Sequence, residues 1–151
     1  MFLDHYGNET TVASQAALDQ YDRGVQLFLG AGFGATEAFR SSIELDDRFA
    51  LGHVALARSL MMSGQMPQAK AEMSLARELS PKLDNRQRQH IECFALLFSG
   101  QPSKARALVK RHVQDHPRDA LVAQLCSNVF GLIGFSGEVG READLLAYTS
   151  T

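Results

Sequence analysis

The sequence predicts an all-α protein in which antiparallel helical hairpins stack in chain order. Three observations lead to this prediction. Apolar residues recur at helical spacing in eight segments, and no segment alternates between apolar and polar residues as a half-buried strand would. Connections of a few residues, rich in glycine and proline, separate these segments. A spacing of small residues and proline also occurs twice, and a repeat of hairpin length is typical of stacked helical units.

The repeat places small or apolar residues and a closing proline at offsets of four, three and five. Its two copies are Ala69, Met73, Ala76, Pro81 and Ala105, Val109, His112, Pro117. In both copies a glycine that ends the preceding helix stands five residues before the first alanine, at Gly64 and Gly100. One such hairpin cannot bury its apolar face alone, so neighbouring hairpins must share a continuous core.

Start and stop signals define the expected helices. Ser14, Asp84 and Asp119 precede apolar runs as helix caps, while Pro67 and Pro102 occupy first turns, where a missing N–H group costs little. Glycines or prolines end most of the runs. The expected helices span about residues 15–29, 35–45, 49–64, 67–79, 84–100, 102–115, 119–134 and 138–149.

Length and composition are those of a single globular domain. We expect a flexible leader at residues 1–14, which show no period, and one domain of about four hairpins over residues 15–151. A formal net charge of -2 and a pI near 6.2 provide no overall field for nucleic acid. The first residues lack a basic n-region, and no apolar run reaches the roughly 18 residues of a membrane span. We therefore expect a cytoplasmic protein with neither a nucleic-acid nor a membrane partner.

The spacing resembles that of the tetratricopeptide repeat (TPR), whose period is about 34 residues. In that repeat the second helix carries an alanine, a bulky residue, another alanine and a closing proline. Two hairpins fit well, whereas the first has Ser42 and Asp47 for the alanine and proline, and the fourth has Val139 for the alanine. The resemblance implies hairpins stacked as a right-handed TPR-like α-α superhelix.

Several short motifs stand in a definite order along the chain. They are Tyr21-Asp22, Phe49-Ala50-Leu51-Gly52-His53, Arg86 with His90, and Gln114-Asp115-His116-Pro117 with Asp119. Across about residues 16–135 these motifs resemble the N-terminal part of the tetratricopeptide repeat protein 38 family, with Asp47 as a departure where the family has proline. That family is longer, which implies that this chain corresponds to an amino-terminal part, and its biochemical role is poorly defined.

In tetratricopeptide repeats the first helix of each hairpin lines the concave face, so exposed residues there are expected to bind a partner. A protein or peptide would be held by Arg58 and His90, which could fix a carboxylate, and by the apolar area of Phe94. The alternative is that these side chains only pack against neighbouring repeats. The expected partner-binding residues are Arg58, Gln87, His90, Phe94, Gln124 and Asn128.

No sequence pattern predicts a catalytic residue, a cofactor or a metal. Four histidines, at positions 53, 90, 112 and 116, lie in different segments and form no HExxH motif. No nucleophile with a recognisable elbow is present. The sequence therefore favours a non-catalytic protein–protein interaction scaffold that binds through the concave face.

Two further hypotheses remain open. In the first, the chain is part of a larger metal- or small-ligand-binding protein, with His53 and His90 converging on a carboxylate such as Asp46, Asp47 or Glu92. In the second, the chain forms a homo-oligomer through apolar residues of the last hairpin. These residues are Leu132, Ile133, Phe135, Leu145, Leu146 and Tyr148.

Overall fold

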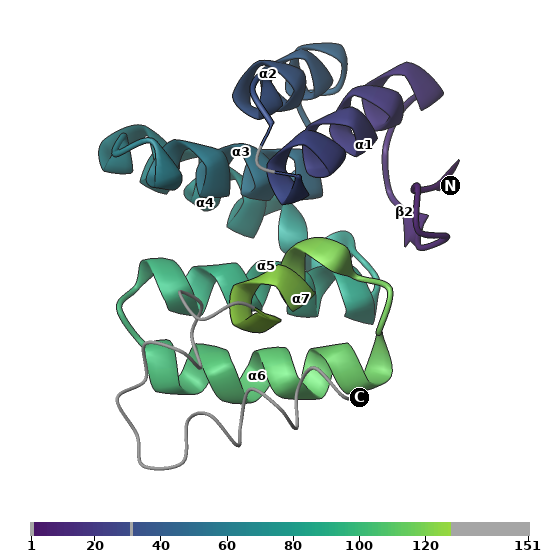
Figure 1. Cartoon of the computed structure of the whole chain (residues 1–151). Helices are drawn as coiled ribbons and strands as arrows, with labels where there is room; N and C mark the ends of the chain where they lie inside the picture. Colours follow the sequence, from purple (N-terminus) through teal and green to yellow (C-terminus); the bar gives the residue numbers. More distant parts are fainter. Residues whose placement is uncertain (1, 31, 128–151) are drawn as a thin grey trace.

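The computed structural model describes residues 2–30 and 32–127, and this part of the chain is mostly α-helical (Figure 1). Two short strands, β1 (Phe2–Leu3) and β2 (Glu9–Thr10), precede the helices and pair with each other in antiparallel fashion. The helices are α1 (Gln15–Leu29), α2 (Ala35–Leu45), α3 (Ala50–Met62), α4 (Met66–Leu79), α5 (Asn85–Phe98), α6 (Pro102–Asp115) and α7 (Ala120–Ser127), with a 3-10 turn, η1 (Ser80–Lys82), after α4.

The helices pack largely as sequential pairs. The pairs α1–α2, α3–α4 and α5–α6 form three hairpins, and α3 contacts both α1 and α5. Figure 1 shows α1 and α2 at one end of the described region and α5, α6 and α7 at the other, with α3 and α4 between them. Helix α7 packs against α6 and also contacts α5 and α1, so it links the two ends. The predicted all-α class and hairpin arrangement are confirmed to this extent: the described residues are mostly helical, and their helices pack largely as sequential pairs.

The predicted helix signals act as expected. The Ser14 hydroxyl accepts a hydrogen bond from the Ala17 N–H at 3.2 Å, and the Asp84 carboxylate accepts one from the Gln87 N–H at 2.9 Å. Gly64 and Gly100 follow α3 and α5 in the left-handed conformation, with φ of 78° and 73°. A residue with a Cβ atom is strained there, which explains why glycine closes both helices.

The repeated positions form the inner face of the second helix of each hairpin. All six positions before the prolines are at most 4% exposed, whether they carry alanine, a larger apolar residue or histidine. The spacing found in the sequence therefore marks core positions. These positions are Ala69, Met73 and Ala76 in α4, and Ala105, Val109 and His112 in α6.

Residues 2–14, which the sequence predicts as a flexible leader, make specific contacts along the chain. The His5 N–H donates to Asp22 at 3.1 Å, and the Ala13 N–H donates to Asp46 at 2.8 Å. Thr10 is 0% exposed. Each of the two hydrogen bonds joins residues far apart in sequence, so the local spacing of apolar residues could not predict it.

Several predictions concern residues outside the described part of the chain. They include the second half of the seventh expected helix, the eighth helix, Asn128 and the apolar residues proposed for self-association. Within residues 2–30 and 32–127, no helix is both long and apolar enough to cross a membrane.

Candidate functional site

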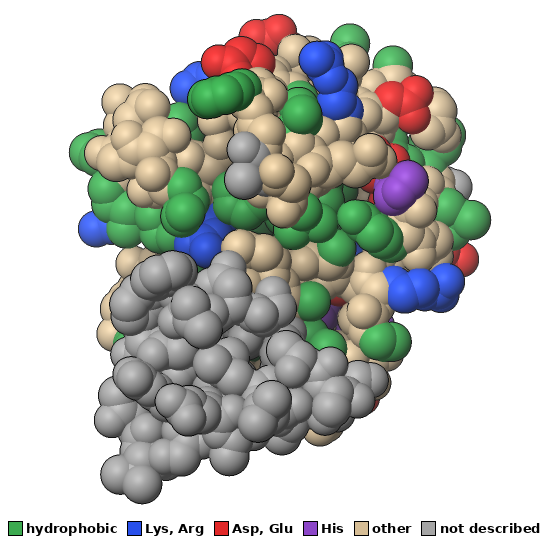
Figure 2. Space-filling model, in the orientation of Figure 1, with side chains coloured by type: hydrophobic (Ala, Val, Ile, Leu, Met, Phe, Trp, Pro, Cys, Tyr) green, Lys and Arg blue, Asp and Glu red, His purple; other side chains and the backbone are tan. Residues whose placement is uncertain are grey.

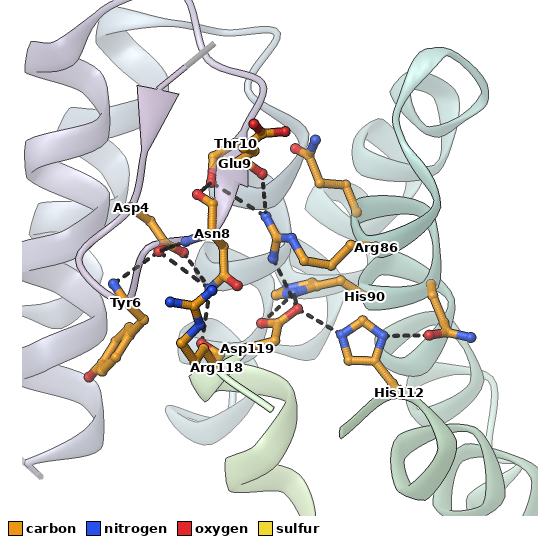
Figure 3. A network of polar contacts seen from close by, with 12 residues as sticks. Asp4, Tyr6, Asn8, Glu9, Thr10, Arg86, His90, His112, Arg118 and Asp119 are labelled. Carbon is orange, nitrogen blue, oxygen red and sulfur yellow. Dashed lines mark hydrogen bonds and ion pairs between the residues drawn. The ribbon is translucent and has the colours of Figure 1, made fainter. Parts of the chain in front are cut away.

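A buried polar network joins α5, α6 and the residue before α7 (Figure 3). The Asp119 carboxylate accepts hydrogen bonds from Arg86 at 3.1 Å, from the Nδ1 atom of His90 at 2.9 Å and from the Nε2 atom of His112 at 2.8 Å. Figure 3 shows these three side chains converging on Asp119. The network continues outward from the Nδ1 atom of His112 to the Gln89 carbonyl oxygen at 2.7 Å. All three groups around the carboxylate are therefore held in fixed positions.

The network is almost closed to solvent. His90 and His112 are 0% exposed, Asp119 is 4% exposed and Arg86 is 8% exposed. Burial raises the pKa of the Asp119 carboxyl, but His90, His112 and Arg86 outweigh that effect and hold the pKa well below its usual range. Asp119 is thus an anion whose charge is compensated inside the protein.

The pairing of His90 with Asp119 has one feature of a general-base dyad. A carboxylate orients the Nδ1 side of the ring, and the Nε2 atom has no hydrogen-bond partner among the described residues. A general base must reach the proton that it removes, however, and His90 is fully buried with its ring 5.3 Å from that of Phe94. The described geometry therefore supports a structural role for this histidine.

The N-terminal segment covers the outer side of this network. The Nη2 atom of Arg86 donates to the backbone carbonyl of Glu9 at 2.9 Å and to the Thr10 hydroxyl at 3.4 Å. Gln87 accepts from the Thr11 N–H at 3.1 Å and donates to the Thr11 hydroxyl at 3.0 Å. Two adjacent side chains of α5 thus bind the extended backbone of residues 9–11.

Three residues expected to be exposed on a concave face are instead buried. Gln87 is 1% exposed, and His90 and Phe94 are 0% exposed. The reason is tertiary: α7 contacts α5, and residues 9–11 bond to Arg86 and Gln87. The alternative stated from the sequence, in which such side chains pack inside the domain, applies to these three.

Arg58 and Gln124, two other expected partner-binding residues, do come together. The Nη2 atom of Arg58 lies 3.5 Å from the Gln124 side-chain oxygen, and the guanidinium lies 6.0 Å from the centre of the Phe28 ring. Both residues are half-buried. The Nε atom of Arg58 has no hydrogen-bond partner within the described residues, and burial lowers the pKa of this side chain. Arg58 is therefore a desolvated cation at the junction of α1, α3 and α7.

His53 belongs to a different network from His90. Its Nδ1 atom lies 2.6 Å from the Glu72 carboxylate, and its Nε2 atom lies 2.7 Å from the backbone carbonyl of Asp47. Both oxygens act as acceptors in this arrangement, which favours the doubly protonated form of the ring. Burial lowers the pKa of His53, but the bonds to Glu72 and Asp47 outweigh it and raise the pKa above its ordinary value.

The structure therefore does not bring His53 and His90 to a shared carboxylate, as the metal hypothesis requires. His53 pairs with Glu72, and His90 pairs with Asp119. Across the described ranges, no three His, Cys, Asp or Glu side chains are grouped so that they could hold a metal ion.

Two open cavities lie on the described surface. One, of about 570 Å³, lies where the end of α1 faces the start of α7, next to Gln124. Its lining residues are Tyr6, Leu29, Pro117, Arg118, Ala120, Ala123 and Gln124. The other, of about 560 Å³, lies between the N-terminal segment, the α2–α3 connection and the end of α4.

Sequence reasoning missed the network around Asp119. The sequence indicates Asp119 as a helix cap and as part of a family motif, and His112 as a repeat position and one of four scattered histidines, without joining the two. A usable signal was present, since histidine occupies in the second copy the position that Ala76 holds in the first. A polar side chain at a buried repeat position needs a buried partner.

The comparisons with known proteins identify no family. No family model matches the chain, and no curated protein and no solved structure matches it significantly.

Proposed function

We propose that this protein is a non-catalytic protein-interaction scaffold whose hairpins stack as a right-handed TPR-like superhelix. The resemblance to the tetratricopeptide repeat protein 38 family supports this assignment through the sequence motifs. The sequential packing of α1–α2, α3–α4 and α5–α6 is consistent with it. On this proposal, the surface that binds a partner is the inner side of the stack.

The binding surface is the cavity between α1 and α7, together with Arg58 beside it. A volume of about 570 Å³ is within the range of ligand sites, and most of the lining side chains are apolar. Among the described residues of the lining, Arg118 is the one charged residue and none is acidic. Figure 2 shows hydrophobic side chains across the middle of one face, with basic side chains on both sides of them.

The observation that carries the proposal is the incomplete pairing of Arg58. A buried guanidinium is costly unless an anion or several acceptors compensate it. Here a single long contact to Gln124 and the face of Phe28 are its described partners. A peptide that places a carboxylate beside Arg58 and an apolar side chain in the cavity would supply the missing acceptor.

A peptide array tests this proposal. The array pairs peptides that contain Asp or Glu and an apolar residue with copies carrying Asn or Gln instead. We expect wild type to prefer the acidic copies, and Arg58→Gln to lower that binding about tenfold, because a charge-assisted hydrogen bond is worth about 1.5–3 kcal/mol. Arg77→Gln, on the exposed side of α4, is the matched control. Absence of peptide binding, or equal binding by Arg58→Gln, would contradict the proposal.

A further inference from the structure

The N-terminal strap, residues 2–13, touches successive parts of the helical stack. Asn8 donates to the backbone carbonyl of Arg118 at 2.9 Å, before α7. Glu9 and Thr11 are bonded to α5, and Ala13 is bonded to Asp46 at the end of α2. Residues 8–13 therefore contact three parts of the helical stack, and Figure 3 shows Asn8, Glu9 and Thr10 beside Arg86 and Arg118.

The contacts on α5 are those by which proteins bind an extended peptide. Arg86 donates to a backbone carbonyl, that of Glu9, so this contact does not depend on the side chain of that residue. Gln87 then pairs with both the N–H group and the hydroxyl of Thr11, which selects a residue with a hydroxyl. Main-chain bonds provide affinity and one side-chain contact provides specificity, as in other modes of peptide recognition.

Residues 8–13 of the strap are attached more by hydrogen bonds than by apolar burial. Thr10 is their one buried residue, Glu9, Thr11 and Ala13 are exposed, and Val12 is half-buried against the core. The earlier part of the strap also packs Phe2 and Tyr6 against the core. A hydrogen bond within the protein replaces one to water, so it contributes only about 0.5–1.5 kcal/mol net to stability. Detachment of such a segment is a local opening that leaves the apolar core intact.

The surface beneath the strap stays organised when the strap leaves. Arg86 is also bonded to Asp119, and Gln87 also donates to the Asp84 carboxylate at 3.1 Å. These bonds hold both side chains in place, so a second extended segment meets donors and an acceptor that are already oriented.

We propose that Arg86 and Gln87 form a second binding site, that residues 8–13 occupy it in the free chain, and that an extended segment of a partner protein binds there by displacing them. The partner segment presents a backbone carbonyl and, two residues later, a serine or threonine hydroxyl. The strap is thus an autoinhibitory occupant. The strap borders the α1–α7 cavity, which Tyr6 and Arg118 line, but Arg86 and Gln87 lie outside that lining. The proposal therefore rests on other contacts than the function proposed above.

A labelled peptide copy of the strap tests displacement on the full chain. The probe is a synthetic peptide of residues 1–14 with a C-terminal fluorophore, and Thr11→Pro in the protein removes both the N–H group and the hydroxyl that hold its own strap. We expect the variant to bind the probe at least about tenfold more tightly than wild type, because the apparent affinity of wild type is scaled by the fraction of chains whose site is unoccupied. Fluorescence anisotropy measures both affinities.

Substitutions at the site separate specific from unspecific binding. In the Thr11→Pro chain, Gln87→Leu should lower probe affinity about tenfold, whereas Arg88→Gln, on the exposed side of α5, should leave it unchanged. A probe with valine in place of Thr11 keeps the N–H bond to Gln87 and loses the hydroxyl bond, so it should bind the Thr11→Pro chain more weakly than the wild-type probe does. Failure of the folded Thr11→Pro chain to bind the probe, or equal binding after Gln87→Leu, would overturn the proposal.

Hydrogen exchange on the unmodified chain provides an independent test if Thr11→Pro does not fold. We expect the amide protons of Thr11 and Ala13 to exchange at least about a hundredfold faster than that of Val54 in α3, because strap opening requires no global unfolding. Equal protection of strap and α3 amides would show that the strap leaves only when the domain unfolds, which would also overturn the proposal.

Discussion

The hairpins α3–α4 and α5–α6 have their turn glycines and small packing residues at equivalent positions, but their buried side chains differ in chemistry. Residues at the same place in the two hairpins are 36 positions apart, as the glycines at 64 and 100 and the alanines at 69 and 105 show. Both glycines adopt positive φ, and both alanines are 0% exposed. The turns and the closest helix contacts are therefore equivalent.

Four buried positions differ in chemistry. Where α3–α4 has apolar residues, α5–α6 has polar ones, yet every one of the eight side chains is at most 8% exposed. The corresponding pairs are Ala50 and Arg86, Leu51 and Gln87, Val54 and His90, and Ala76 and His112. The same arrangement of two helices and a turn thus accommodates either apolar side chains or a polar network at these four positions.

The difference shows what a polar core adds. The apolar residues of α3–α4 require only neighbours of suitable shape. The polar residues of α5–α6 require specific acceptors, and they obtain them from Asp119 before α7 and from the N-terminal strap. Buried polar groups carry a desolvation cost that only correctly placed partners offset. The polar hairpin therefore selects which segments pack against it.

The largest expected effect is that of removing the shared acceptor. Asp119→Ala removes the carboxylate that Arg86, His90 and His112 share and leaves these three side chains buried without it. We expect this substitution to lower the free energy of unfolding by about 3–5 kcal/mol. Urea denaturation followed by circular dichroism measures the loss. Asp115→Ala, at an exposed position of α6, is the matched control and should change stability by less than about 0.5 kcal/mol.

The pH dependence of that loss has a definite sign. The pKa of Asp119 is lowered in the folded protein, so its contribution is present above the ordinary value of 3.8 and is lost as the pH falls below it. The difference in stability between wild type and Asp119→Ala should therefore shrink as the pH falls below 3.8. A difference that stays unchanged as the pH falls below 3.8 would contradict the assignment of Asp119 as the compensated anion.

Exchanging residues between the two hairpins should cost less, about 2–4 kcal/mol for each substitution. His112→Ala leaves a cavity and removes a donor from Asp119, while Ala76→His places an unpartnered polar ring in an apolar cluster. Thermal and urea unfolding of both variants check this. Ala71→His, on the exposed side of α4, controls for helix propensity. Losses below about 0.5 kcal/mol at both positions would mean that the two interiors are interchangeable.

The closing glycines should respond alike. Gly64→Ala and Gly100→Ala place a Cβ atom in the left-handed conformation, which costs about 1–2 kcal/mol, and no atom outside the turn lies within 4 Å to add a clash. We expect the two losses to agree within about 0.5 kcal/mol in urea denaturation. Unequal losses would show that the two hairpins differ at their turns as well as in their buried side chains.

The smallest expected effect comes from the charged pair in α3–α4. The pKa of His53 is raised above 6.5 in the folded protein, so its stabilising contribution is fully present below pH 6.5 and is lost as the pH rises through the folded value. Because Glu72 is partly exposed, we expect the contribution to be below about 1 kcal/mol.

Histidine titration by NMR measures this pair directly. Glu72→Gln should lower the pKa of His53 because it removes the carboxylate that favours the imidazolium. Glu78→Gln, at an exposed position near the end of α4, should leave it unchanged. A pKa of His53 that does not respond to Glu72→Gln would rule out the ion pair.

The fold was largely predictable because its signals are local. The spacing of apolar residues, the caps at Ser14 and Asp84 and the glycines at 64 and 100 act within one or two helical turns, and the expected helices agree closely with α1 to α6. The candidate site was predicted only in part. Arg58 and Gln124, both predicted as partner-binding residues, contact each other, but sequence alone could not reveal that other segments cover Gln87 and His90.

By itself, the sequence determined the helices, their order and the buried positions of the repeat, because helical period and turn chemistry are encoded within each hairpin. Only the tertiary structure decided what the polar residues at those positions do. Arg86 and His90 are separated from Asp119 by 33 and 29 positions, and Arg86 from Glu9 by 77. Such contacts depend on how the hairpins and the strap pack, and no local pattern specifies that packing.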